Sequence, residues 1–348
     1  MLRGNVPSFR FPHLLLLMAL GLGHSAASLA EDPLSATGPR GQVLLAEVGA
    51  SAELTLADGT LLSVQLAAGM DVTSLAALDE GWLLAGTERP AGDGRRLFVM
   101  RGDGGGGERL AAPGVAGSLV QRGAVLLARD GRLAGMAWLE GDDARALAVK
   151  AAPWKGDGWG AVELVSGRGP GSQVALTGAV LADGSWLLAW AAFDGEDDEI
   201  VWARRTDAGW SASGRAFADN SVPDIVPSLA AAGNGALLAW SRLEGEQYRL
   251  QLARFERGGW APARSIAGPG TLYPSFQGGP EGPRLVYLDA ALRGWAVAQL
   301  DAGGRVTKRA ALITDAEDRP LSELVGESVR LRWPGGGRSH DLVWRREP

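Results

Sequence analysis

The sequence predicts an all-β fold, a six-bladed β-propeller of four-stranded antiparallel blades over residues 42–348. Two observations support this prediction. Residues 184–210 and 235–260 are near copies, each with an apolar run ending in Trp, an acidic turn, a second apolar run and a closing Gly-Trp. The ends of the first apolar runs also recur along the chain, with spacings of 52, 52, 50, 47 and 46 residues. Repeats of about this length are typical of propeller blades.

The first 30 residues have the pattern of a signal peptide. Arg3 and Arg10 precede or border an apolar core at residues 14–22, and the small residues Ser28 and Ala30 come just before Glu31. That core is short for a membrane span, which needs about 20 apolar residues. We therefore expect cleavage near residue 30 and a periplasmic or secreted mature chain without a membrane span. An uncleaved anchor is the alternative.

Charge and composition exclude several classes of function. Cleavage removes two Arg and leaves 32 basic against 40 acidic residues, a net charge of −8. A strongly acidic chain is a poor match for nucleic acid, so we expect no such partner. The chain has no Cys, which excludes disulfides and thiol chemistry.

Residues 31–41 are expected to form a flexible leader before the propeller. Residues 42–67 then hold two or three short strands, with a turn at Asp58-Gly59. The last repeat ends soon after its third strand, so we expect one of these N-terminal strands to complete the last blade. A seven-bladed ring, with residues 42–67 as part of a further blade, is the first alternative, and a two-sheet sandwich is the second.

The best copy of the repeat places four strands at residues 225–229, 236–240, 248–255 and 261–266. The second of these is apolar on both sides, which predicts that both faces of the blade are covered. One blade cannot cover its own faces, so several must pack together in a ring. Side chains of the second strands should then be buried between blades. They are Leu188, Trp190, Leu238 and Trp240.

The turn after the second apolar run supplies a family resemblance. Thr206-Asp207-Ala208-Gly209-Trp210 is a degenerate Asp-box, with weaker echoes at residues 155–159 and 257–260. On these motifs, about residues 70–345 resemble the sialidase-like, BNR-repeat β-propellers. The resemblance implies the exo-sialidase machinery of an arginine triad, a Tyr–Glu nucleophile pair and an acidic Asp.

The residues of the chain do not support three common catalytic sets. The expected inner strands, near 118–120, 174–176, 225–229 and 274–276, contain no Arg for a sialidase triad. After cleavage His340 is the only His, which excludes a Ser–His–Asp triad and a His-based zinc site.

Acidic turns recur between the second and third strands of three consecutive units, at residues 140–143, 194–199 and 244–246. Propeller geometry gathers these turns on one face, together with the connections between blades. The expected binding residues on this face are Asp143, Asp194, Asp197, Asp198, Asp219, Asp224 and Glu246. Such carboxylates can bind Ca²⁺, act as a glycosidase acid pair, or serve as solvated turn residues.

These patterns predict an exported, non-catalytic propeller that acts as a binding or assembly module of the cell envelope. Its partner, a protein or a glycan, is expected on one face of the ring. No cofactor is expected, and a bound Ca²⁺ ion is the alternative. The alternative is a sialidase-like exo-glycosidase or another glycan hydrolase.

Overall fold

The computed structural model describes residues 34–48, 51–89, 94–103, 106–114, 120–143, 145–167, 171–218, 220–278, 282–314, 318–333 and 339–346. The expected signal peptide lies outside these ranges. Every regular element within them is a β-strand, and none of the described segments forms a helix with the length and hydropathy of a membrane span.

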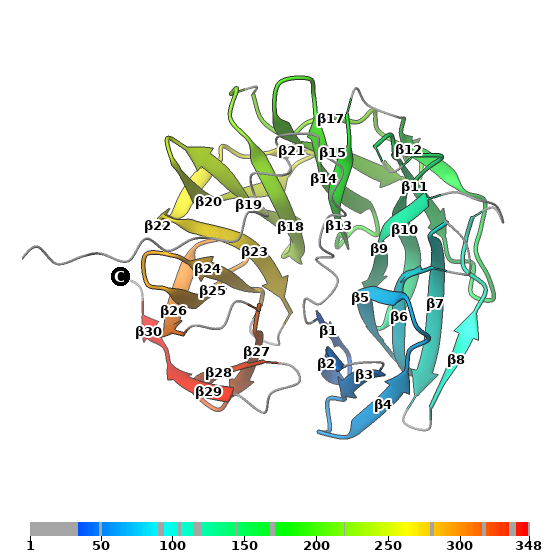
Figure 1. Cartoon of the computed structure of the whole chain (residues 1–348), viewed down its shortest axis with the longest axis horizontal. Coiled ribbons are helices and arrows are strands. Elements are labelled where there is room, and N and C mark those ends of the chain that lie inside the picture. The colour runs from blue at the N-terminus through cyan, green and yellow to red at the C-terminus, as the bar shows by residue number, and fades with distance from the viewer. Residues whose placement is uncertain are drawn as a thin grey trace, which may run out of the picture.

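The strands form seven antiparallel sheets arranged as blades around a central axis (Figure 1). Blades 1 to 3 have four strands each. They are β1 (Leu34–Gly38), β2 (Gly41–Val48), β3 (Ser51–Thr55) and β4 (Leu61–Gln65); β5 (Met70–Leu78), β6 (Gly81–Glu88), β7 (Arg96–Asp103) and β8 (Gly106–Leu110); and β9 (Val120–Arg129), β10 (Arg132–Gly141), β11 (Ala148–Pro153) and β12 (Glu163–Ser166).

Blades 4 to 6 have five strands and blade 7 has three. They are β13 (Gln173–Val180), β14 (Trp186–Phe193), β15 (Asp198–Thr206), β16 (Gly209–Trp210) and β17 (Gly214–Arg215); β18 (Asp224–Ala232), β19 (Gly235–Glu244), β20 (Gln247–Glu256), β21 (Gly259–Trp260) and β22 (Arg264–Pro269); β23 (Thr271–Gln277), β24 (Arg284–Asp289), β25 (Gly294–Leu300), β26 (Val306–Ile313) and β30 (Arg345–Arg346); and β27 (Leu321–Val325), β28 (Ser328–Arg332) and β29 (Ser339–Val343).

The all-β class is confirmed, but the expected count of six blades is wrong and the seven-bladed alternative is correct. Strands β1–β4 pair only with one another, so they form a blade of their own instead of completing the last one. Strand β1 also begins at Leu34, inside the expected leader. The repeat is recognised by apolar runs that carry an aromatic residue, and residues 34–65 contain no aromatic residue, so this blade lacks that signal in the sequence.

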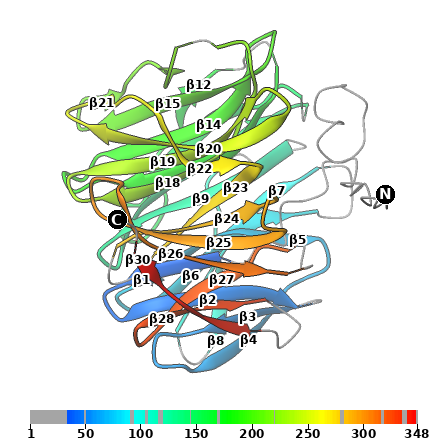
Figure 2. The ribbon, with the colours of Figure 1, turned by 90° about the vertical axis from the view of Figure 1, so that its left-hand side faces the viewer.

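The core lies between the blades, whose sheets are seen stacked side by side in Figure 2. Trp138, Trp190, Trp240 and Tyr287 hold equivalent positions on the second strands of blades 3 to 6, and all four are fully buried. Each belongs to an apolar cluster with the preceding blade; Trp240, for example, packs with Leu187 and Ile200 of blade 4. The expected burial of the second strands is therefore confirmed.

A different contact joins the two ends of the chain. Blades 1 and 7 are neighbours in the ring (Figure 1), and no apolar cluster of described residues spans them. Arg284 of blade 6 is fully buried beside them and donates hydrogen bonds to Ser322 Oγ of blade 7 at 3.1 Å and Gln42 Oε1 of blade 1 at 3.2 Å. Gln42 Nε2 donates to the carbonyl of Gly278 at 3.1 Å. The ring thus closes at this seam through polar side chains.

A β-bulge recurs in the inner strands, at the same height in blades 3 to 6. Its residues Gly123, Ala175, Val226 and Tyr273 have positive φ angles of 57°, 52°, 51° and 56°. This conformation is strained for side chains larger than Gly, most of all for a β-branched Val. The bulge lies next to the strand ends that carry the acidic residues, since Val226 is two residues from Asp224.

We expect Trp240→Ala to lower the free energy of unfolding by about 3–5 kcal/mol, because it empties a large buried site between blades 4 and 5. Phe193→Ala is the control, since that ring is 36% exposed; its cost should be about 1 kcal/mol or less. Urea unfolding measures both, and equal small losses would contradict the packing described here.

Candidate functional site

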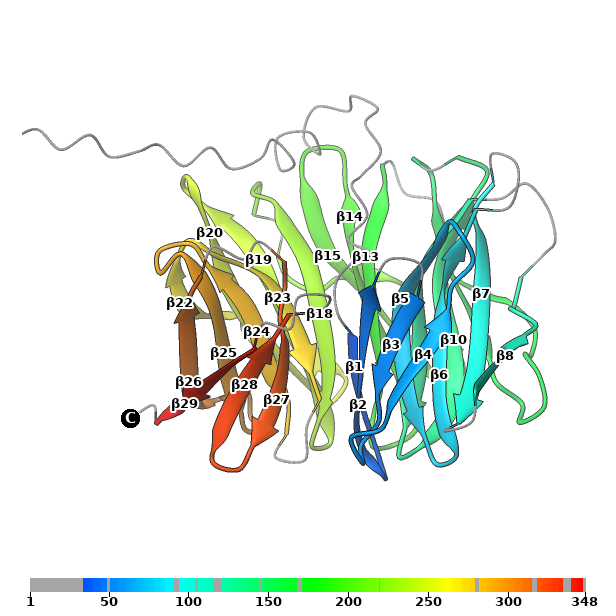
Figure 3. The ribbon, with the colours of Figure 1, turned by 60° about the horizontal axis from the view of Figure 1, so that its bottom comes forward.

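The antiparallel order places each turn between a second and a third strand on one face of the ring, together with the blade-to-blade connections. We call this the hairpin face; the described residues of its turns in blades 3 to 5 are 142–143 with 145–147, 194–197 and 245–246. Figure 3 shows the tips of β14–β15 and β19–β20 on the same side of the molecule. The opposite face holds the turns between first and second strands.

All expected binding residues that the structure describes lie on or at the hairpin face, and Asp219 falls outside the described residues. Asp143 and Glu246 are exposed in the turns of blades 3 and 5. Asp194 and Asp197 come together in the turn of blade 4 with Glu199, which belongs to the same acidic run but was not among the expected binding residues.

The turn of blade 4 forms because Asp194 caps its own backbone. Asp194 Oδ1 accepts hydrogen bonds from the N–H groups of Glu196 at 2.8 Å and Asp197 at 3.2 Å. Gly195 supplies a φ of 120°, which disfavours other residues. These backbone N–H groups, with the nearby charge of Arg215, lower the pKa of Asp194. Arg215 also forms an ion pair with Asp194 at 2.5 Å.

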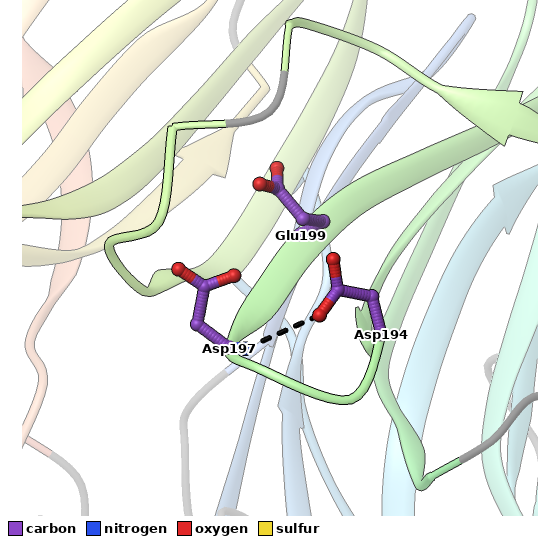
Figure 4. Close-up of side chains that lie close together, drawn as sticks. All are labelled: Asp194, Asp197 and Glu199. Carbon is purple, nitrogen blue, oxygen red and sulfur yellow. Dashed lines mark hydrogen bonds between the residues drawn. The ribbon is translucent and has the colours of Figure 1, made fainter.

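Carboxylate oxygens of Asp194, Asp197 and Glu199 lie within 4.8 Å of one another and form what we call the acidic cluster (Figure 4). Asp197 is 8% exposed and Glu199 is 1% exposed. Asp198 lies between them in sequence, and its side chain points to the other side of β15 because strand residues alternate. Burial, followed by the charges of Asp197 and Asp194, raises the pKa of Asp198.

Glu199 is the most perturbed carboxyl group of the site. Burial, followed by the negative charges of Asp224 and Asp197, raises its pKa to about 7. The backbone N–H of Asn220 and the charge of Arg215 oppose it. Within the described part of the chain, Glu199 Oε1 has no hydrogen-bond partner. Near neutral pH, a bound proton or cation would therefore stabilise the cluster.

Asp224, by contrast, is held by partners within the protein. Its fully buried carboxylate accepts two hydrogen bonds from Arg242, at 2.8 and 2.7 Å, and one from Trp240 Nε1 at 2.9 Å. Asn220 Nδ2 donates a further one at 3.0 Å. These bonds tie the start of β18 to the core aromatic of the same blade, so Asp224 has a structural role and shapes the electrostatics of Glu199.

A second buried glutamate, which the sequence did not single out, lies in blade 3. Glu140 is 3% exposed and accepts hydrogen bonds from Gln121 at 2.6 Å, from Trp138 at 3.0 Å and from Lys150. Burial alone would raise its pKa, but the bonds from these three residues outweigh burial and lower it. Glu140 is thus buried as Glu199 is, but its carboxylate has hydrogen-bond partners within the protein.

A basic group also lies on the hairpin face, between blades 2 and 3. Strand β9 carries Arg122, so the expectation that no Arg lies on the inner strands is wrong. That expectation placed the strand near residues 118–120, and β9 instead begins at Val120. Burial and the charges of Arg95 and Arg89 lower the pKa of Arg122. Arg95 forms an ion pair with Asp71 at 3.0 Å.

The central channel opens as a cavity of about 420 Å³ toward the opposite face. Small residues of the inner strands form most of its wall, including Ala128, Gly178, Ala179 and Ala231. The acidic cluster is not part of this wall, so the cavity and the cluster are separate features.

Comparison with known proteins supports the fold and gives no family. Models of known protein families and curated protein sequences give no match to the chain. Among solved structures, the polysaccharide lyase Uly1 superposes with a TM-score of 0.56 at 10% identity, over 93% of this chain and 91% of that one. Virginiamycin B lyase from Staphylococcus aureus gives 0.53 at 12%, over 91% and 96%.

A third match is the GH93 α-L-arabinofuranosidase of Fusarium graminearum, with a TM-score of 0.50 at 12% identity, over 79% of this chain and 93% of that one. At such low identity these likenesses show the β-propeller fold alone. The three proteins are lyases and a glycosidase by name, so they do not select the sialidase-like family or a single activity for this chain.

Glu199 makes stability depend on pH. Its pKa rises from 4.5 to about 7 on folding, so its contribution to stability is full below pH 4.5 and is lost as pH rises through 7. We expect Glu199→Gln to reduce the fall in unfolding free energy between pH 5 and 8 by about 1–3 kcal/mol. Urea unfolding with a chelator present measures this, with Asp207→Asn as control. Parallel pH profiles for Glu199→Gln and the unmodified protein would contradict it.

Proposed function

We propose that this chain is an exported binding propeller whose hairpin face binds a basic partner, either a protein or a cationic glycan. The observation that supports this proposal is the charge of the turns. In the three consecutive turns of blades 3 to 5, Arg145 is the one basic residue. Their exposed acids are Asp142, Asp143, Glu196 and Glu246.

Nearby basic side chains already have acidic partners. Lys150 pairs with Glu140, Arg242 with Asp224 at 2.7 Å, and Arg249 with Glu244 at 3.0 Å. The acids at the tips of the turns therefore stay in excess, and their potential favours a cationic partner and speeds its association.

Burial of the candidate acids supports binding over hydrolysis. A general acid must come within hydrogen-bond reach of its substrate. Glu199 is 1% exposed, and Asp224 is fully buried in an ion pair. The proposed location in the periplasm or outside the cell rests on the pattern of the first 30 residues.

One observation favours the alternative of a glycan hydrolase. Arg122, with Arg95 and Arg89 nearby, provides positive charge on the same face, as an anionic glycan would require. A panel of fluorogenic glycosides distinguishes the two roles. Turnover that Arg122→Ala abolishes would favour the hydrolase and overturn the binding proposal.

We expect a decalysine peptide to bind the mature protein and to bind more weakly at 300 mM than at 50 mM NaCl. The triple variant Asp143→Asn, Glu196→Gln and Glu246→Gln should weaken binding about tenfold, since each exposed charge pair contributes up to about 1 kcal/mol. Calorimetry measures both effects.

The charge-matched control carries Asp130→Asn, Asp207→Asn and Glu256→Gln on the opposite face, and it should bind as the unmodified protein does. Equal weakening by the two triple variants would show that net charge, and not the hairpin face, determines binding. Tighter binding of decaglutamate than of decalysine would refute the proposal.

We expect the exported protein to begin near Glu31, because residues 14–22 and the small residues after them fit a cleaved signal peptide. N-terminal sequencing of the protein recovered from the periplasm or the medium measures this. A chain that keeps Met1 would contradict cleavage.

A further inference from the structure

The acidic cluster has the composition of a metal site. Its three members, Asp194, Asp197 and Glu199, offer carboxylate oxygens and no nitrogen or sulfur. Oxygen-only sets of this kind suit hard divalent cations such as Ca²⁺ and Mg²⁺. Since one turn and the strand that follows it supply all three, the spacing of the ligands is set locally (Figure 4).

The number of carboxylates favours the larger of these ions. The offered oxygens lie within 4.8 Å of one another, so one ion can contact all three side chains. Ca²⁺ takes about six to eight oxygen ligands in a flexible geometry. Mg²⁺ requires a near-octahedral geometry and usually keeps several waters beside one or two carboxylates. Three protein carboxylates in one place therefore suit Ca²⁺ better than Mg²⁺.

An independent observation points to a bound ligand. Glu199 is 1% exposed and, among the residues that the structure describes, none donates a hydrogen bond to its Oε1. Figure 4 shows its carboxylate beside those of Asp194 and Asp197. A buried carboxylate oxygen without a partner destabilises the fold unless it is neutralised or bound.

Glu140 shows how this fold satisfies a buried glutamate with its own side chains. In blade 3, Lys150 and Gln121 reach Glu140 from the adjoining strands, and Trp138 reaches it from the same strand. In blade 4, Arg215 forms an ion pair with Asp194 of the cluster and acts on Glu199 through its charge. Lys150 donates a hydrogen bond to Glu140, whereas no described residue donates one to Glu199 Oε1.

We infer that the acidic cluster is a divalent-cation site for Ca²⁺, with Asp194, Asp197 and Glu199 as its protein ligands. Water completes the coordination shell, as is usual for Ca²⁺ with few protein ligands. The ion supplies to Glu199 the positive charge that Lys150 supplies to Glu140. This ligand differs from the proposed basic partner, so the two proposals hold or fail separately.

The test is calorimetric titration of the chelator-treated, purified mature protein with CaCl₂. We expect one Ca²⁺ per chain, a thermal unfolding temperature that rises with CaCl₂ concentration, and at least tenfold weaker binding of Mg²⁺. Glu199→Gln and the double variant Asp197→Asn with Asp198→Asn should each weaken Ca²⁺ binding at least tenfold. Asp207→Asn, on the opposite face, should leave it unchanged.

Further variants separate Ca²⁺ binding at the acidic cluster from binding of the basic partner and from loss of folding. The triple variant Asp143→Asn, Glu196→Gln and Glu246→Gln should bind Ca²⁺ within twofold of the unmodified protein even if it loses decalysine. Circular dichroism and the unfolding temperature without Ca²⁺ identify a variant that fails to fold. If Glu199→Gln were such a variant, the Asp197 and Asp198 pair would decide.

Absence of Ca²⁺ binding by the folded, unmodified protein overturns the inference. The inference is also overturned if both folded variants, Glu199→Gln and the double variant Asp197→Asn with Asp198→Asn, bind Ca²⁺ as tightly as the unmodified protein. The ion would then lie elsewhere. Decalysine binding without Ca²⁺ binding would leave the proposed function standing and remove the metal site alone.

Discussion

The whole ring depends on the packing of one large aromatic side chain from each of several blades against the blade before it. Trp138, Trp190, Trp240 and Tyr287 fill equivalent sites between consecutive sheets, and each is fully buried. Since a blade has two apolar faces, it is stable only between two neighbours. This constraint fixes the tilt and spacing of the sheets, which in turn places the turns of blades 3 to 5 side by side on one face.

The core also shapes the polar groups at its edge. The indole nitrogens of Trp138 and Trp240 donate to Glu140 and Asp224, which are held buried by this contact and by Lys150 or Arg242. The equivalent Trp190 Nε1 has no such carboxylate among the described residues. Glu199, on the third strand of that blade, feels the charge of Arg215, but its Oε1 accepts no hydrogen bond from the described residues. In blades 3 and 5 the buried indole is therefore hydrogen-bonded to a carboxylate that also pairs with a basic residue, and in blade 4 the described residues form no such network.

The repeat, the strand type and the face of the acidic turns could be predicted from sequence, because local periodicity and turn residues determine them. The number of blades could not, because blade 1 has short strands and no aromatic residue to align. Asp194 and Asp197 were found through turn composition. Glu199 was missed because its raised pKa depends in part on the charge of Asp224, which is distant in sequence. Arg122 was missed because β9 begins later than expected.

The polar seam between blades 1 and 7 has a mechanical consequence. Arg284, Gln42 and Ser322 join the two ends of the ring through hydrogen bonds, and Arg332 of blade 7 donates one more to Thr55 Oγ1 of blade 1 at 3.1 Å. Hydrogen bonds require a narrow range of distance and angle, so they weaken steeply when two blades move apart. The seam is therefore the place at which the ring would open first, while the aromatic packing between blades 2 to 6 holds the other sheets together.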